Sequence, residues 1–250
     1  MILKFIKIIS ILIISSFSIL NAQDLETRFN LANKAYADGE YFQAIEIYSG
    51  IINEGIESGE VYFNLANAYY KVNDLGRAIL YYEKARKFIE GDPALEQNIK
   101  LAQLRIVDKI EPIPELFIIE WWSYLIHIFS LDTWLWSNLF IFSILMLMII
   151  FQFLYSRQFL KNLIGTTTVL FLLVFIITLS VTYEFETTKF GVILEEKVSV
   201  VSEPDSDGTE VFILHEGTKV KINRNLDNWM EISIPDGKIG WLKQTSLEII

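Results

Sequence analysis

Four asparagines are the side chains best placed, by type and spacing, to contact another molecule. Asn30 and Asn33 lie in a Phe-Asn-Leu-Ala-Asn segment that begins at Phe29, and Asn64 and Asn67 occupy the same segment 34 positions later. A carboxamide offers both donors and acceptors, so these residues can hydrogen-bond the backbone of an extended peptide. The alternative is that some of the amides are satisfied within the fold.

The chain offers few residues for catalysis or metal binding. It contains no Cys, which excludes thiolate catalysis and Cys-based zinc or iron–sulfur sites. Its two His residues, His127 and His215, have no second ligand at a metal-binding spacing, and no nucleophile–base pair or phosphate loop is recognisable. We therefore expect no enzymatic activity, no metal and no cofactor.

The 34-residue shift indicates which elements position the asparagines. It is the period of tetratricopeptide repeats, each of which is a pair of antiparallel helices. Small Ala32 and Ala66 let paired helices approach closely, and Gly39 and Asn73 suit the positive φ of the turn between them. Two such repeats follow one another.

A capping helix is expected next, because two repeats bury too little surface alone. Asp92 is a suitable N-cap for a helix that begins at Pro93. An apolar stripe at helical spacing follows, formed by Leu95, Ile99, Ala102 and Ile106. Residues 23–110 are thus predicted to form an α-helical tetratricopeptide solenoid with its cap.

Asn33 and Asn64 occupy repeat positions that hold a carboxylate-binding Asn pair in chaperone-adaptor tetratricopeptide proteins, which this region resembles. That clamp also uses basic side chains, where this chain has Phe29, Ala94 and Asn98. The departure argues against an acidic C-terminal tail as the ligand.

Three apolar segments indicate a membrane protein. Residues 1–22 have the basic start and apolar centre of a secretory signal peptide, with cleavage expected after Ala22 and an uncleaved anchor helix as the alternative. Residues 133–155 and 163–183 contain no charge and are long enough to span a bilayer, which predicts a two-helix transmembrane hairpin.

The charges around the hairpin predict its orientation. The loop 156–162 carries Arg157 and Lys161 and no acidic residue, so the positive-inside rule places it in the cytoplasm. Both polar regions then lie outside the cytoplasm. The excess of 31 acidic over 21 basic residues disfavours nucleic acid as a partner.

Residues 111–132 are rich in Pro and Trp and are expected to lie in the membrane interface. The alternative is a first span that begins at Trp121. It would bury Asp132, which costs roughly 2.5 to 3.5 kcal/mol at the centre of a membrane helix.

Residues 190–250 alternate in the manner of five or six short strands, and Asp236-Gly237 indicates a hairpin turn before the last of them. Their landmarks resemble the bacterial SH3 family, in the order Glu203-Pro204, Gly217-Thr218, Asp236-Gly237 and Gly240-Trp241. The resemblance implies a small all-β SH3-like barrel. Trp229 follows a turn and is the candidate for ligand contact, whereas Trp241 is expected in the core.

The order of segments resembles the E-type family of Bacteroides aerotolerance (Bat) operon proteins. The resemblance is also carried by residues 105–112, by Trp121-Trp122 and by residues 212–218. It implies an inner-membrane scaffold that works with von Willebrand factor A domain membrane proteins and a MoxR-type ATPase in tolerance to oxygen or envelope stress.

The leading hypothesis is therefore a non-enzymatic, multidomain membrane adaptor that presents two protein-interaction modules to the periplasm. The alternative is a cell-wall sensor, in which the SH3-like tail binds peptidoglycan peptides. An envelope hydrolase is disfavoured by the absence of Cys and the isolation of both His residues.

Overall fold

A computed structural model describes residues 23–114 and 116–250 of the chain. They divide into two compact units. Residues 23–111 and 190–250 together form the array–sheet unit, and residues 112–189 form the helix unit. The predicted signal segment, residues 1–22, lies outside the described residues.

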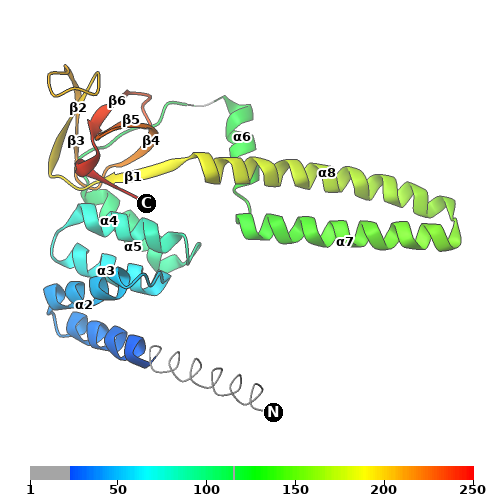
Figure 1. Cartoon of the computed structure of the whole chain (residues 1–250), viewed down its shortest axis with the longest axis horizontal. Helices are drawn as coiled ribbons and strands as arrows, with labels where there is room; N and C mark the ends of the chain where they lie inside the picture. Colours follow the sequence, from blue (N-terminus) through cyan, green and yellow to red (C-terminus); the bar gives the residue numbers. More distant parts are fainter. Residues whose placement is uncertain (1–22, 115) are drawn as a thin grey trace, which may run out of the picture. The chain divides into compact units, whose positions relative to one another are not determined.

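Paired helices make up the first part of the array–sheet unit (Figure 1). A helix over residues 23–37 is followed by α2 (Tyr41–Asn53), α3 (Gly59–Lys71), α4 (Leu75–Arg86) and α5 (Pro93–Arg105). Consecutive helices pack on one another, and their shared core contains Ala32, Tyr48, Ala66 and Tyr82, all buried. The small residues admit close helix packing while the tyrosines fill the remaining space.

The turns and caps of this helical array follow the sequence predictions. Gly39 and Asn73 both have positive φ, at 83° and 67°. The Asp92 carboxylate accepts hydrogen bonds from the backbone N–H groups of Ala94 and Leu95, and Pro93 is the first residue of α5. The predicted N-cap of the capping helix is therefore confirmed.

Residues 189–249 supply seven strands. They are β1 (Lys189–Ile193), β2 (Lys197–Val201), β3 (Glu210–His215), β4 (Lys219–Leu226), β5 (Trp229–Ser233), β6 (Ile239–Lys243) and β7 (Leu247–Ile249). The sheet order is β3-β2-β6-β5-β4-β1-β7. The sheet is open, with β3 and β7 at its edges, so the strand pairing establishes an antiparallel all-β region without closure into a barrel.

The hairpin between β5 and β6 turns at Asp236-Gly237, as predicted, and Gly237 has a φ of 84°. The sequence pattern predicts five or six strands and does not anticipate β7, which pairs with β1. A three-residue strand is too short for its alternation to be distinguished from a loop.

The sheet is joined to the helical array through apolar contacts. Val192 of β1 is fully buried in the same cluster as Ile79 and Leu80 of α4, and Ile106 and Leu194 pack against this cluster. The array and the sheet therefore meet in one hydrophobic cluster, while most of the buried strand residues form a second cluster within the sheet.

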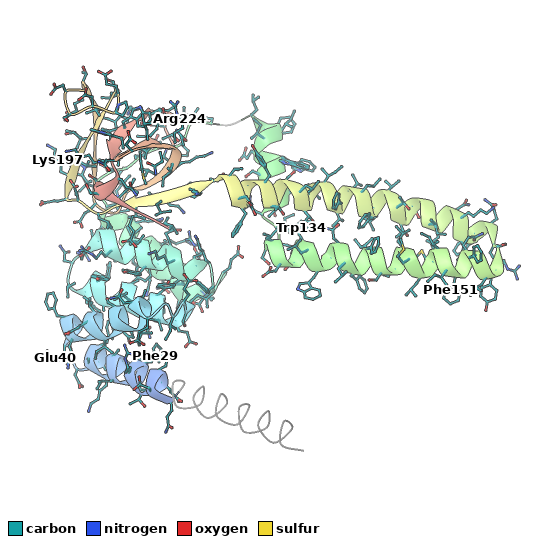
Figure 2. All side chains as sticks on the ribbon, in the orientation of Figure 1. Phe29, Glu40, Trp134, Phe151, Lys197 and Arg224 are labelled. Carbon is teal, nitrogen blue, oxygen red and sulfur yellow. The ribbon has the colours of Figure 1, made fainter. Side chains whose placement is uncertain are left out.

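The helix unit contains α6 (Phe117–Ile126), α7 (Leu131–Tyr155) and α8 (Gln158–Thr187). α7 and α8 pack side by side, and both are long and apolar enough to cross a membrane. Large side chains such as Phe151 project away from the helix pair (Figure 2). The length of α7 and α8 and their exposed apolar side chains suggest membrane insertion.

Candidate partner-binding site and array–sheet clasp

Two asparagine pairs cross between the repeats, and each pair binds a buried tyrosine. Asn33 Oδ1 accepts hydrogen bonds from Asn64 Nδ2 at 2.9 Å and from the Tyr48 hydroxyl at 2.5 Å. One repeat later, Asn67 Oδ1 accepts from Asn98 Nδ2 at 2.8 Å and from the Tyr82 hydroxyl at 2.7 Å. We call these two arrangements the first and second amide rungs.

The rungs are direct consequences of the repeat. Each amide pair spans 31 residues, and each tyrosine lies 15 residues after the asparagine that it contacts. The same side chains therefore meet at each boundary between helix pairs. Leu101 stands 34 residues after Asn67, and the rung pattern ends there because leucine has no amide.

The tyrosines are neutral donors throughout the physiological pH range. Burial raises the pKa of the Tyr48 hydroxyl to about 12, and a hydrogen bond from Asn64 opposes this shift only in part. Burial also raises the pKa of Tyr82, and by more. Each hydroxyl therefore keeps its proton and occupies part of the acceptor capacity of an asparagine oxygen.

The amide groups of the rungs keep unused hydrogen-bonding capacity. Asn33, Asn64 and Asn67 are half-buried, and the Nδ2 groups of Asn33 and Asn67 donate no hydrogen bond within the described residues. Each –NH2 has two donors and the Asn64 oxygen has two lone pairs. The rungs thus combine a structural role, through their bonded oxygens, with donors that a peptide carbonyl can accept.

The remaining predicted residues lie apart from these pairs. Asn30 is exposed on the helix 23–37, at the position equivalent to Asn64 and Asn98. Trp229 is half-buried at the start of β5, where it pairs with Leu226 and Lys243. The structure brings together Asn33 with Asn64, but it places Asn67 with Asn98 rather than with another predicted residue.

Asp108 forms a second polar site, which we call the clasp, between the array and the sheet. Its Oδ2 accepts from the His215 backbone N–H at 2.7 Å and from the Thr218 hydroxyl at 2.6 Å. Its Oδ1 lies 2.8 Å from His215 Nδ1. Burial alone would raise the pKa of the Asp108 carboxyl, but the hydrogen bonds from Thr218 and His215 lower it below the usual value.

Both chain connections to the helix unit pass through the clasp. Asp108 precedes the first connection, and Ile193 of β1 follows the second. The Ile193 carbonyl accepts from the Gly217 N–H at 2.8 Å, and the Ile193 N–H donates to the Thr218 carbonyl at 3.0 Å. The turn at 215–218 therefore hydrogen-bonds the segment that leads to the helix unit, through Asp108, and the segment that follows the helix unit, through Ile193.

A buried carboxylate adds to this interface. The Glu83 side chain is only 4% exposed, and it accepts from Lys219 Nζ at 2.9 Å and from Arg86 Nη1 at 3.1 Å. Two cations compensate the charge of one buried acid, as burial of a carboxylate requires. The array helix α4 and strand β4 are thereby linked at a fixed position.

Gly76 lies where α4 approaches the sheet closely. A Cβ atom at this position would lie 3.1 Å from the Ile193 carbonyl oxygen and 3.3 Å from Leu194 Cα. The Gly76 N–H also donates to the Glu216 carboxylate at 3.3 Å. A side chain at this position would therefore press on backbone atoms of the sheet, and glycine is favoured by this packing and not by an unusual φ.

No group of three or more potential metal ligands occurs in residues 23–114 and 116–250. His215 is half-buried and is engaged by Asp108, and within the described chain no hydroxyl nucleophile contacts its ring. The Asp108–His215 pair is accordingly assigned a structural role, in which the carboxylate orients the imidazole.

Comparison with known families assigns one repeat of the array. Residues 59–92 match the tetratricopeptide repeat family model. The match spans α3, α4 and the turn that leads to the cap of α5. A comparison with curated proteins gives no match. Tetratricopeptide repeats are protein-interaction modules, so protein partners are expected and catalysis is not.

The tetratricopeptide period also explains which site residues sequence reasoning missed. Asn98 stands 34 residues after Asn64, so the second rung was visible as a third member of the series Asn30, Asn64 and Asn98. The hydrogen-bonding role of Tyr48 and Tyr82 was not visible, because a core tyrosine satisfies its hydroxyl in many ways. No short sequence motif predicts the clasp, since Asp108 and His215 are 107 residues apart.

Proposed function

We propose that this protein is a non-enzymatic membrane scaffold whose repeats bind an extended segment of a partner protein through the two amide rungs. The observation that carries the proposal is the recurrence of the Asn–Asn–Tyr arrangement one tetratricopeptide period apart. A peptide backbone presents carbonyls at regular intervals, and a repeated row of amide donors matches this pattern.

The test must separate the ligand role of an amide from its role in the fold. Asn33→Ala would leave the Tyr48 hydroxyl without its acceptor, which destabilises the array whatever the ligand does. Asn33→Asp keeps the acceptor oxygens for Tyr48 and Asn64 and replaces only the –NH2 donor. Asn53→Asp, at an exposed position on α2, is the matched control for the added charge.

We expect Asn33→Asp to weaken capture of the partner by roughly two- to tenfold, because one hydrogen bond contributes about 0.5 to 1.5 kcal/mol. The control should leave capture unchanged, and circular dichroism should show equal helix content in both variants. A photo-crosslinking residue at exposed Asn30, followed by mass spectrometry, would supply the partner for this assay. Unchanged capture by Asn33→Asp would locate the binding surface elsewhere.

Further parts of the proposal concern the membrane. The chain is laid out as a signal peptide (1–22), tetratricopeptide repeats (23–110), an interfacial segment (111–132), transmembrane helices (133–155 and 163–183) joined by a cytoplasmic loop (156–162), and an SH3-like domain (190–250). Both polar regions face the periplasm under this layout. A reporter fused after Ile250 should be active outside the cytoplasm, and activity only inside would contradict the orientation.

The Bat-type assembly is the proposed setting of the scaffold. The resemblance to the E-type family names von Willebrand factor A domain membrane proteins and a MoxR-type ATPase as partners. Two of the segments that carry the resemblance, 105–112 and 212–218, contact each other through Asp108 and His215. Crosslinked peptides from unrelated proteins would contradict it.

Peptidoglycan peptides are a second candidate ligand, through Trp229, whose ring is not fully buried. Retention of the full chain on cell-wall sacculi should then fall on Trp229→Ala. Equal retention of the variant would exclude this face as the site.

A further inference from the structure

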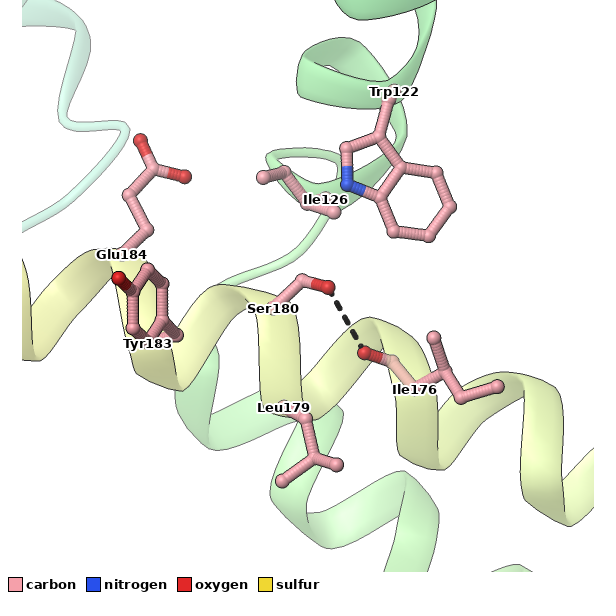
Figure 3. A pocket seen from close by; sticks show the side chains of 7 residues that line it. All are labelled: Trp122, Ile126, Ile176, Leu179, Ser180, Tyr183 and Glu184. Atoms are coloured by element: carbon pink, nitrogen blue, oxygen red, sulfur yellow. Dashed lines mark hydrogen bonds between the residues drawn. The ribbon is translucent and has the colours of Figure 1, made fainter.

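A shallow pocket lies between α6 and α8 within the helix unit. It is an open depression with a volume of about 490 Å³. Trp122 and Ile126 of α6 form one wall, and α8 forms the other (Figure 3). The α8 wall consists of Ile176, Leu179, Ser180, Tyr183 and Glu184.

The α6 wall is held in place by specific contacts. The Trp134 indole N–H of α7 donates to the Ile126 carbonyl at 3.1 Å, and the Trp134 side chain is buried. The rings of Phe129 and Trp134 meet edge to face, with centroids 5.4 Å apart. The loop between α6 and α7 is thus fixed against α7, which keeps Trp122 and Ile126 opposite α8.

The pocket is apolar at one end and polar at the other. Ile176 and Ile126 offer only carbon, and the Ser180 hydroxyl is occupied because it donates to the Ile176 carbonyl at 3.1 Å. Polar groups gather at the Tyr183 and Glu184 end. His127 Nε2 lies 3.6 Å from Glu184 Oε1, beyond hydrogen-bond distance but close enough for an ion pair when the imidazole is protonated.

Glu184 is the one charged side chain among the residues that line the pocket. Glu120, Asp132 and Glu186 lie in the same unit, and residues 112–156 and 162–188 contain no Lys or Arg, although Lys189 ends the unit. A headgroup with only negative charge would offer no partner for Glu184. A primary ammonium group would meet a carboxylate at the boundary of an apolar surface, where ion pairing is stronger than in water.

We propose that this pocket binds a phospholipid with a zwitterionic, primary-amine headgroup, of the phosphatidylethanolamine type. One acyl chain lies between Ile126 and Ile176, and the ammonium group binds Glu184. The indole N–H of Trp122 and the hydroxyl of Tyr183, which donate no hydrogen bond within the described residues, face the phosphate. The inference rests on the proposed membrane location, and it adds a lipid preference that the location alone does not require.

The test uses the full chain purified in detergent and titrated with phosphatidylethanolamine or phosphatidylglycerol of identical acyl chains, with bound lipid counted by native mass spectrometry. We expect phosphatidylethanolamine to be retained about threefold to fivefold better, in line with one partly exposed ion pair. Glu184→Gln should remove this preference. Glu186→Gln, which changes an exposed acid that does not line the pocket, should keep it.

Ser180→Phe fills the pocket and should reduce retention of both lipids, with helix content checked by circular dichroism. Equal retention of the two lipids by the unmodified chain, or equal effects of Glu184→Gln and Glu186→Gln, would overturn the proposal. Alkaline extraction of native membranes separates this failure from failure of the membrane location itself. A chain released by alkali is not an integral membrane protein, whereas a chain that stays but shows no lipid preference contradicts only the pocket.

Discussion

The array–sheet unit and the helix unit place the same kinds of side chain in opposite ways. In the array–sheet unit, Leu65, Leu80 and Ile232 are fully buried. In the helix unit, Leu147 is 56% exposed and Phe153 is 90% exposed. Apolar residues gain stability only when removed from water, so the first unit supplies its own apolar surroundings and the second needs them from outside.

Most hydroxyl groups of α7 and α8 bond within their own helix, with Thr167, which donates to Met148 Sδ of α7, as an exception, whereas the core tyrosines of the array bond across helices. The Tyr48 hydroxyl of the array donates across a helix boundary to Asn33. In the helix unit, Ser143 and Thr168 donate to carbonyls four residues earlier in their own helices, Leu139 and Ile164. Local satisfaction of this kind suits a helix in lipid, where no water can satisfy a hydroxyl.

The largest expected effect comes from a charge on the exposed face of α7. Leu147→Arg should cost roughly 2.5 to 3.5 kcal/mol if α7 spans a bilayer, because a guanidinium near the membrane centre is poorly solvated. The measure is the fraction of chain that resists alkaline extraction. Leu101→Arg is the control, since Leu101 is also exposed but lies on α5 of the array. Equal effects of the two substitutions would contradict the view that α7, unlike the array, has lipid around its exposed apolar side chains.

The next largest effect is expected at the clasp. Asp108→Ala should weaken the attachment of the turn 215–218 by roughly 1.5 to 3 kcal/mol, since it removes the shared acceptor of three hydrogen bonds. Hydrogen exchange of the full chain should become faster in β1 and in the turn 215–218, while α2 and α3 stay protected. Uniform loss of protection would mean that the array depends on the sheet for its own folding.

Acid should weaken the same attachment. Because the pKa of Asp108 is lower in the folded protein than its ordinary value of 3.8, the carboxylate stabilises the clasp above that value. This stabilisation is lost as the pH falls through the lower, folded-state pKa. Protection from exchange at 215–218, taken relative to the intrinsic exchange rate at each pH, should be steady near neutral pH and should fall below about pH 4. Asp108→Asn should show lower protection at neutral pH and should lose the acid-dependent fall.

Local structure was predictable wherever neighbouring residues determine it. The repeat period gave the helix pairs, and Gly39, Asn73 and Asp92 gave their turns and cap. The joining of array and sheet was not predictable, because Asp108 and His215 are distant in sequence and each is an ordinary surface residue by type. The second amide rung could have been predicted from the sequence, since Asn98 continues the 34-residue series.

The smallest expected effect compares hydroxyls in the two units. Tyr48→Phe should lower the stability of the array by about 1 kcal/mol, because a buried hydrogen bond to Asn33 is lost without a compensating contact with water. Ser143→Ala in α7 should change the stability of the helix unit by only a few tenths of a kcal/mol, because its hydroxyl bonds to a carbonyl that already belongs to the helix ladder. Hydrogen exchange of the full chain in nanodiscs measures both changes under one condition. If Ser143→Ala cost as much as Tyr48→Phe, the hydroxyls of α7 would have to contribute to packing between helices, and the distinction between cross-helix bonding in the array and local bonding in the helix unit would fail.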